Sequence, residues 1–166
     1  MKLSREILRL IETAISAQSN AYCPYSSYSV GAAVLTESGQ IFPGCNIENA
    51  SYGLSICAER VALFNAITRN QTSIKAICVV GSSAKPCGAC RQVMLEFSTK
   101  ETELYLVDFN PKTNRRKVVR TSVFKMLPAP FDPVASGLLP AHPKNLLRAR
   151  ASLSRRPRHH RRGRRR

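Results

Sequence analysis

The chain has 166 residues, enough for one domain with a core of its own and too few for two comfortable ones. Its formal net charge of +16 comes mostly from one end, since residues 133–166 contain 11 lysines and arginines and no acidic residue. Residues 1–132 contain 15 basic and 10 acidic residues, so the basic excess says little about the folded part. No apolar run is long enough to cross a bilayer, which argues against a membrane-spanning helix. We expect one intracellular catalytic domain over residues 1–132 and a disordered basic tail over residues 133–166.

Helical and strand patterns alternate through residues 1–132. Apolar residues recur at three- and four-residue steps from Ser4 to Ser19, which predicts an amphipathic helix with Ser4 as its N-cap. A loop with three tyrosines follows and leads into a hairpin. The predicted elements are strands over 28–36, 41–47, 74–81, 104–109 and 117–121, helices over 57–70 and 87–97, and a short helical piece ending at residue 127. This alternation implies an α/β protein whose sheet is covered on both faces.

Two short segments contain three cysteines with the spacing of a metal site. Cys87 and Cys90 are separated by two residues, which lets both thiols reach one ion, and Cys57 lies thirty residues earlier. All three histidines lie in the tail, so we expect the ligand set Cys57, Cys87 and Cys90 around one Zn²⁺ per chain. Three ligands leave a fourth position for water, as in catalytic zinc sites. A thioredoxin-like redox pair has the same two-residue spacing but would leave Glu59 without a role.

The residues beside these cysteines supply further chemistry. Three thiolates around Zn²⁺ leave a net charge of about −1, which opposes the fall in the pKa of a bound water. We expect Arg60 and Arg91 to offset this by donating hydrogen bonds to the thiolates. Glu59, two residues after a ligand, is predicted to move a proton from the water to a ring nitrogen and then to a leaving amine.

Other polar and sulfur-containing residues give weaker signals. Asn46 and Glu48 alternate with apolar residues at a strand end, which places both on one side, where an amide and a carboxylate can hold vicinal hydroxyls. A solvated strand end would show the same pattern. The three remaining cysteines are interpreted as small buried apolar residues: Cys23, Cys45 and Cys78.

Five motifs in this order resemble the small homotetrameric cytidine deaminases of pyrimidine salvage, over about Ser4 to Phe131. They are Pro24-Tyr25-Ser26, Val30-Gly31-Ala32-Ala33, Gly44-Cys45-Asn46-Ile47-Glu48-Asn49-Ala50, Cys57-Ala58-Glu59-Arg60 and Pro86-Cys87-Gly88-Ala89-Cys90-Arg91-Gln92. The resemblance implies a three-layer α/β/α sandwich with a five-stranded mixed sheet. It also implies hydrolysis of cytidine and deoxycytidine to uridine and deoxyuridine with release of ammonia.

The resemblance further implies roles for individual residues. Asn46 and Glu48 would hold the ribose 3′-hydroxyl, and the backbone of Ala58 together with Glu59 would recognise the pyrimidine. Tyr28 would face the base. Two more aromatic residues would reach into the site of a neighbouring subunit: Tyr52 and Phe131.

The tail after residue 132 departs from this family pattern. Its arginines are compatible with a solvated appendage, with nucleic-acid binding, or with a nuclear-localisation signal, although a cytoplasmic enzyme is the expectation. Two alternative functions remain at this point. One is deamination of cytosine in RNA or single-stranded DNA, and the other is a structural zinc module that binds nucleic acid through the tail.

Overall fold

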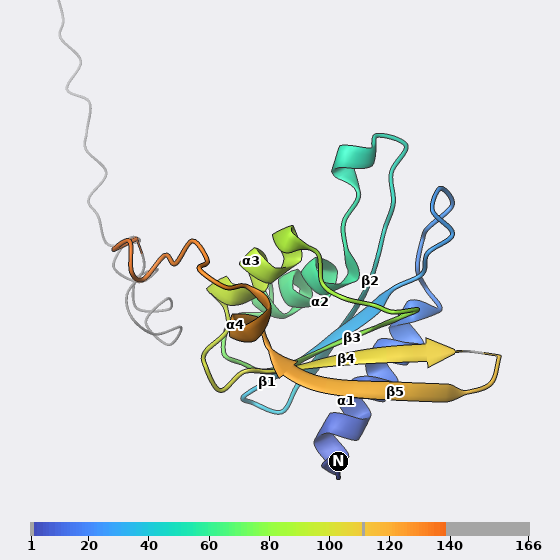
Figure 1. Cartoon of the computed structure of the whole chain (residues 1–166), viewed down its shortest axis with the longest axis horizontal. Coiled ribbons are helices and arrows are strands. Elements are labelled where there is room, and N and C mark those ends of the chain that lie inside the picture. Colours follow the sequence, from blue (N-terminus) through green and yellow to red (C-terminus); the bar gives the residue numbers. More distant parts are fainter. Residues whose placement is uncertain (1, 111, 139–166) are drawn as a thin grey trace, which may run out of the picture.

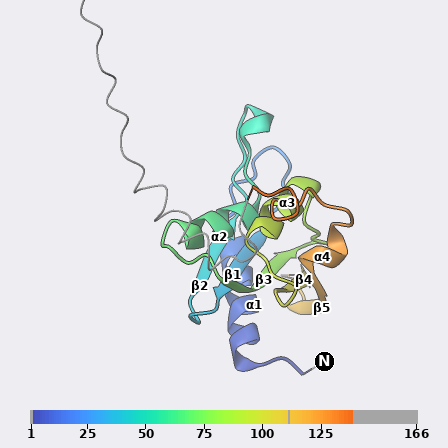
Figure 2. The ribbon, with the colours of Figure 1, turned by 90° about the vertical axis from the view of Figure 1, so that its left-hand side faces the viewer.

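A computed structural model describes residues 2–110 and 112–138, which form a single sheet with helices on both faces (Figures 1 and 2). The strands lie in the order β2-β1-β3-β4-β5, with β3 and β4 parallel and the other neighbours antiparallel. The five-stranded mixed sheet is therefore confirmed. In chain order the elements are α1 (Arg5–Gln18), β1 (Gly31–Thr36), β2 (Ile41–Cys45), the 3-10 helix η1 (Tyr52–Leu54), α2 (Ala58–Ile67), β3 (Ile74–Gly81), α3 (Gly88–Glu96), β4 (Glu103–Asn110), β5 (Arg115–Ser122) and α4 (Val123–Met126).

Two hydrophobic cores, one on each face of the sheet, make the fold a three-layer sandwich. Successive side chains of a strand point to opposite faces, so each strand contributes to both cores. One core joins the apolar stripe of α1 to the sheet and includes Leu10, Ile11, Leu35, Cys78 and Val80. The other joins α2, α3 and α4 to the opposite face and includes Leu63, Val34, Ile77, Val79 and Met94. The predicted α/β/α architecture is confirmed.

Most element boundaries agree with the sequence pattern, but the first strand begins three residues later than predicted, and helix α2 ends three residues earlier. The hydroxyl of Ser4 caps α1 as expected, accepting from the backbone N–H of Ile7 at 3.3 Å. Residues 28–30, in contrast, are bound by a side chain: Nδ2 of Asn46 donates to the carbonyl of Tyr28 at 2.9 Å, and Oδ1 accepts from the N–H of Val30 at 2.8 Å. The backbone groups that would extend the strand are thus used by an amide from a distant residue.

Helix α2 lies unusually close to β2. A Cβ atom placed on Gly44 would be 2.3 Å from the backbone nitrogen of Ala62 and 2.7 Å from the carbonyl oxygen of Ala58. Both are backbone atoms of α2, which cannot move aside as a flexible side chain can. The absence of a side chain at this position therefore sets the distance between the sheet and the helix that Cys57 caps and whose first turn carries Glu59.

Replacement of Gly44 with alanine should strongly destabilise the protein. We expect a loss of about 3 kcal/mol or more in the free energy of unfolding, because the added methyl forces backbone apart. Denaturant titration, monitored by circular dichroism, measures this loss of stability. Gly53 is the matched control, since nothing lies within 4 Å of an added Cβ there; Gly53→Ala should change stability by less than about 0.5 kcal/mol. Equal stability of the two variants would contradict the close approach.

The three cysteines outside the two zinc-type segments do not behave alike. Cys78 is buried in β3, as predicted, but Cys23 and Cys45 are only half-buried, and for them the prediction is wrong. Cys45 ends the edge strand β2, and its thiol donates to the carbonyl of Asn20 at 3.3 Å. An edge strand has a neighbour on one side only, so its last residue keeps access to solvent.

The chain outside the sandwich is described only in part. Among residues 2–110 and 112–138, no helix has the length and apolar character needed to cross a membrane. The predicted boundary at residue 132 falls within the described segment, whereas residues 139–166 of the predicted tail lie outside the described residues.

Candidate metal and active site

Three thiols meet where two helices begin on the same face of the sheet. Cys57 and Cys87 are the N-cap residues of α2 and α3, and Cys90 lies in the first turn of α3. Their sulfur atoms all lie within 4.8 Å of one another, with 4.0 Å between those of Cys57 and Cys87. Thiolates bound tetrahedrally at 2.3 Å from zinc lie about 3.8 Å apart, so the donor set and its spacing fit a zinc ion. The positive ends of both helices also face these thiolates.

Glu59 lies in the first turn of α2 and is only 4% exposed. Burial raises the pKa of its carboxyl group, and the negative charge of Cys57 raises it further, while a hydrogen bond with Cys90 and the charge of Arg60 act in the opposite direction. A raised pKa makes a carboxylate a better proton acceptor, which is what general acid–base catalysis requires. Glu59 therefore has the environment that a proton-transfer residue requires.

Arg60 contacts the thiol cluster directly. Its Nη2 atom donates to Sγ of Cys57 at 3.7 Å and to the carbonyl of Ser55 at 3.4 Å. The pKa of Cys57 is lowered to about 5, first by a hydrogen bond from Cys90 and then by Arg60, so this thiol is held as the thiolate that a metal requires.

Arg91 has different partners from those that the sequence suggests. Its Nε donates to the carbonyl of Pro86 at 2.7 Å and its Nη1 to the carbonyl of Met126 at 2.8 Å. The guanidinium group thus joins the segment before Cys87 to the last residue of α4, instead of bonding a thiolate. The planar fork of donors on arginine suits two carbonyls that approach from different segments.

Asn46 and Glu48 face the loop of residues 19–30, which projects from the same end of the sheet as residues 46–57 (Figures 1 and 2). Glu48 accepts hydrogen bonds from the backbone N–H groups of Tyr25 at 2.9 Å and Ser26 at 3.2 Å, and from the hydroxyl of Ser26. These bonds lower the pKa of Glu48, the Ser26 hydroxyl most of all. Together with the amide of Asn46, they order the loop that carries Tyr28, a role that the sequence did not suggest.

Tyr28 connects this loop to the loop that precedes α3. Its hydroxyl donates to the carbonyl of Ser82 at 2.6 Å, and the next residue, Ser83, donates its N–H to Oδ1 of Asp108 at 3.0 Å. Burial raises the pKa of Tyr28, and the negative charges of Asp108 and Glu59 raise it further. Asp108 and Ser82 were not singled out from the sequence, because their contacts join residues 25 to 54 positions apart.

The remaining predicted site residues lie on separate segments. Ala58 is fully buried as the first residue of α2, next to Cys57. Tyr52 is 74% exposed on η1, where its ring lies 5.7 Å from that of Tyr25. Phe131 is 64% exposed, and its carbonyl accepts from Nε2 of Gln92 at 2.8 Å, which holds the segment after α4 against α3.

Comparisons with known proteins agree on one family. Residues 4–106 match the family model described as the cytidine and deoxycytidylate deaminase zinc-binding region. The chain is 41% identical over 130 residues to a cytidine deaminase of Sporosarcina psychrophila, covering 76% of this chain and 92% of that protein. It is 44% identical over 125 residues to one of Halalkalibacterium halodurans, covering 74% and 91%.

A solved structure extends the similarity to the fold. The crystal structure of a cytidine deaminase from Burkholderia pseudomallei is 43% identical, with a TM-score of 0.64, and the match covers 78% of this chain and all of that one. Residues 4–106, which match the family model, contain α2 and α3, at whose N-termini the three thiols and Glu59 lie. The chain therefore belongs to the zinc-dependent cytidine and deoxycytidylate deaminase family of hydrolases.

Proposed function

We propose that this protein hydrolyses cytidine and deoxycytidine to uridine and deoxyuridine, releasing ammonia. The observation that carries the proposal is the buried carboxyl group of Glu59 in the same helical turn that begins with Cys57, beside a cluster of three thiols. Zinc bound there supplies a Lewis acid that activates water at neutral pH. The relatives are named cytidine deaminases, and the match covers almost their whole length.

Different residues of the chain have different roles in the reaction. Glu59 takes a proton from the attacking water and delivers it to the ring nitrogen next to the carbon under attack. It then transfers a second proton to the amino group, which leaves as ammonia. Arg60 draws negative charge from Cys57, which keeps three thiolates from cancelling the charge of the metal. Arg91 acts indirectly, because it holds the segment that leads into Cys87.

We further propose that the substrate is held by residues around this centre. The backbone of Ala58 recognises the pyrimidine together with Glu59, and Tyr28 faces the base. The ribose 3′-hydroxyl is held by Asn46 and Glu48, whose carboxylate and amide also order the neighbouring loop. A ribose hydroxyl can donate to Glu48 and accept from Asn46, since the two groups offer complementary chemistry.

Two exposed aromatic residues support assembly into a homotetramer. Tyr52 and Phe131 expose most of their surface, although burial of an aromatic ring is favourable. We propose that each inserts into the active site of a neighbouring subunit, so that activity depends on assembly.

The physiological role proposed is pyrimidine salvage in the cytoplasm, where reducing conditions keep metal-binding thiols free.

The direct test is an absorbance assay with purified full-length protein. Cytidine and deoxycytidine should both lose absorbance on deamination, while a short cytosine-containing RNA or single-stranded DNA should not. Turnover of the polynucleotide but not of either nucleoside would overturn the proposal in favour of the polynucleotide alternative. If neither the nucleosides nor the polynucleotides are turned over although zinc is bound, the result would favour a structural zinc module.

Removal of residues 133–166 should leave the kcat and KM for cytidine within about twofold of the full chain, as expected for a solvated appendage. The matched control is a shorter chain that ends at Pro128 and so loses Phe131, which we expect to lower kcat/KM by at least about tenfold because an aromatic substrate contact is lost. Steady-state kinetics and a sizing column give both readouts. Collapse of activity on removing residues 133–166 alone would place the tail within the folded enzyme.

A further inference from the structure

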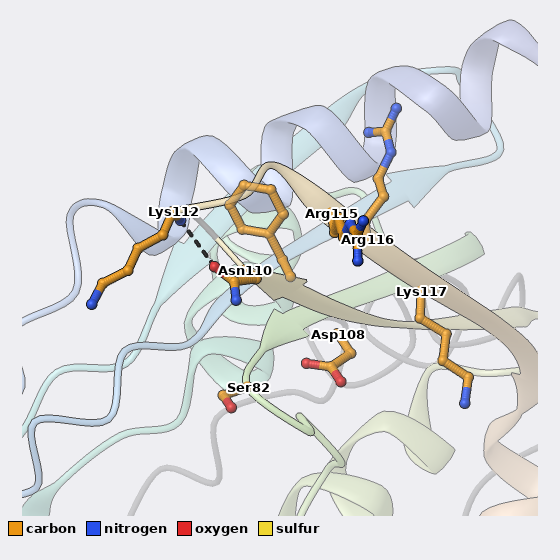
Figure 3. Close-up of a pocket in the computed structure, with 8 residues that line it drawn as sticks. Ser82, Asp108, Asn110, Lys112, Arg115, Arg116 and Lys117 are labelled. Carbon is orange, nitrogen blue, oxygen red and sulfur yellow. Dashed lines mark hydrogen bonds between the residues drawn. The ribbon is translucent and has the colours of Figure 1, made fainter.

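A concave surface of about 740 Å³ lies outside the candidate active site, around the turn of the β4–β5 hairpin (Figure 3). Four of its eight lining residues are cationic and one is acidic. The lining residues are Ser82, Asp108, Phe109, Asn110, Lys112, Arg115, Arg116 and Lys117. A neutral nucleoside has no need of this charge, so the proposed function does not explain it.

Basic residues on one face of β5 have acidic partners. Arg116 and Arg120 are two of the alternating residues that face α1. Arg116 forms an ion pair with Glu12 of α1, and Arg120 forms one with Glu103 of β4. The positive charge on this face is therefore balanced within the fold.

The opposite face of β5 also carries basic residues. Arg115 and Lys117 lie across from Asn110 and Asp108 in the strand register, on the face away from α1. Within residues 2–110 and 112–138, neither cation forms an ion pair with a carboxylate. Asp108, the acidic residue of the lining, uses Oδ1 to accept from the N–H of Ser83. The lining therefore carries a net positive charge, since Arg115, Lys117 and Lys112 outnumber its one carboxylate and Arg116 is already paired with Glu12.

We propose that this cavity binds a phosphate-bearing anion, with Arg115 and Lys117 as its principal partners. A phosphate group offers several acceptor oxygens, which match the fork of donors on arginine and the ammonium of lysine. Lys112 also lines the cavity. Oδ1 of Asn110 accepts from the N–H of Lys112, which leaves the amide nitrogen of Asn110 as a further donor.

The size and position of the cavity indicate the class of ligand. Its volume exceeds what inorganic phosphate needs and falls in the range of about 300–1,000 Å³ that small-molecule sites occupy. Ser82 lines the cavity, and its carbonyl accepts from the hydroxyl of Tyr28, so the cavity adjoins the loop that leads to Cys87. We assign it to the phosphates of a nucleotide, either free or within a short strand.

The test compares three full-length proteins, so that the basic tail is the same in each. One is unchanged, one carries Arg115→Gln with Lys117→Gln, and the control carries Arg5→Gln with Arg9→Gln. The control removes the same net charge from exposed positions of α1. Calorimetric titration with ATP, inorganic phosphate and a ten-residue oligothymidylate, at low and at 0.15 M salt, gives the affinities.

We expect the Arg115 and Lys117 variant to bind phosphate ligands at least about tenfold more weakly, because charge-assisted hydrogen bonds are lost. The control should change affinity by less than about twofold. Tighter binding of ATP would identify a free nucleotide, and tighter binding of the oligonucleotide would identify a strand. Equal affinity in all three proteins would assign binding to the tail and overturn the proposal, as would the absence of binding. Unchanged cytidine turnover in the variant shows that it is folded.

Discussion

Replacement of Glu59 with glutamine will lower the rate of cytidine deamination by about 10²- to 10⁴-fold while zinc remains bound at about one ion per chain. Glutamine has nearly the same shape, so it fits the buried position in the first turn of α2. It cannot accept the proton of the attacking water or pass one to the leaving amine. The substitution should lower kcat and leave the zinc content unchanged, which separates proton transfer from metal binding.

Steady-state kinetics and metal analysis of the same preparation measure this result. Glu37→Gln is a suitable control, since Glu37 is exposed in the turn between β1 and β2 and should keep full activity. Near-normal turnover in the Glu59 variant would reject the proton-transfer role. Loss of zinc together with activity would instead make Glu59 a residue that supports the metal site.

Replacement of Cys87 with alanine will remove both zinc and activity. Cys87 is the exposed member of the three-thiol cluster, so its loss disturbs the core less than loss of the buried Cys90. Two thiols cannot complete a three-ligand zinc site, and the metal content should fall below about a tenth of an ion per chain after dialysis. The melting temperature should also fall, because a ligand that binds only the folded state stabilises it.

Cys23→Ala provides the matched control for this experiment. Cys23 is a half-buried free thiol that lies outside the cluster, so its variant should keep zinc and activity. Inductively coupled plasma mass spectrometry, thermal melting and the cytidine assay together give the readouts. A Cys87 variant that retains about one zinc per chain would show that Cys87 is not a ligand and would require a different set.

The elements that the sequence predicts best are those buried on both faces or marked by a cap. Strand β3 spans Ile74–Gly81 as predicted, because its β-branched residues pack into both cores. Helix α1 begins after Ser4, whose hydroxyl satisfies a free backbone N–H. Strand β1 was predicted too long because the amide of Asn46, sixteen residues or more away, occupies the backbone of residues 28–30.

The chemistry of the site was determined by the sequence itself. The spacing of Cys57, Cys87 and Cys90, the absence of histidine from residues 1–132, and the carboxylate of Glu59 define the donor set and its general acid–base partner. These features depend on residue type and on local helical geometry, which short motifs encode.

Only the tertiary structure decided the contacts between distant segments. It placed Arg91 on the carbonyls of Pro86 and Met126, and linked Tyr28 through Ser82 to the loop before α3. It also separated the cations of β5 that have acidic partners, Arg116 and Arg120, from Arg115 and Lys117, which form no ion pair among the described residues. A hydrogen bond or an ion pair requires two groups within about 3 to 4 Å, and no local pattern records that distance when dozens of residues intervene.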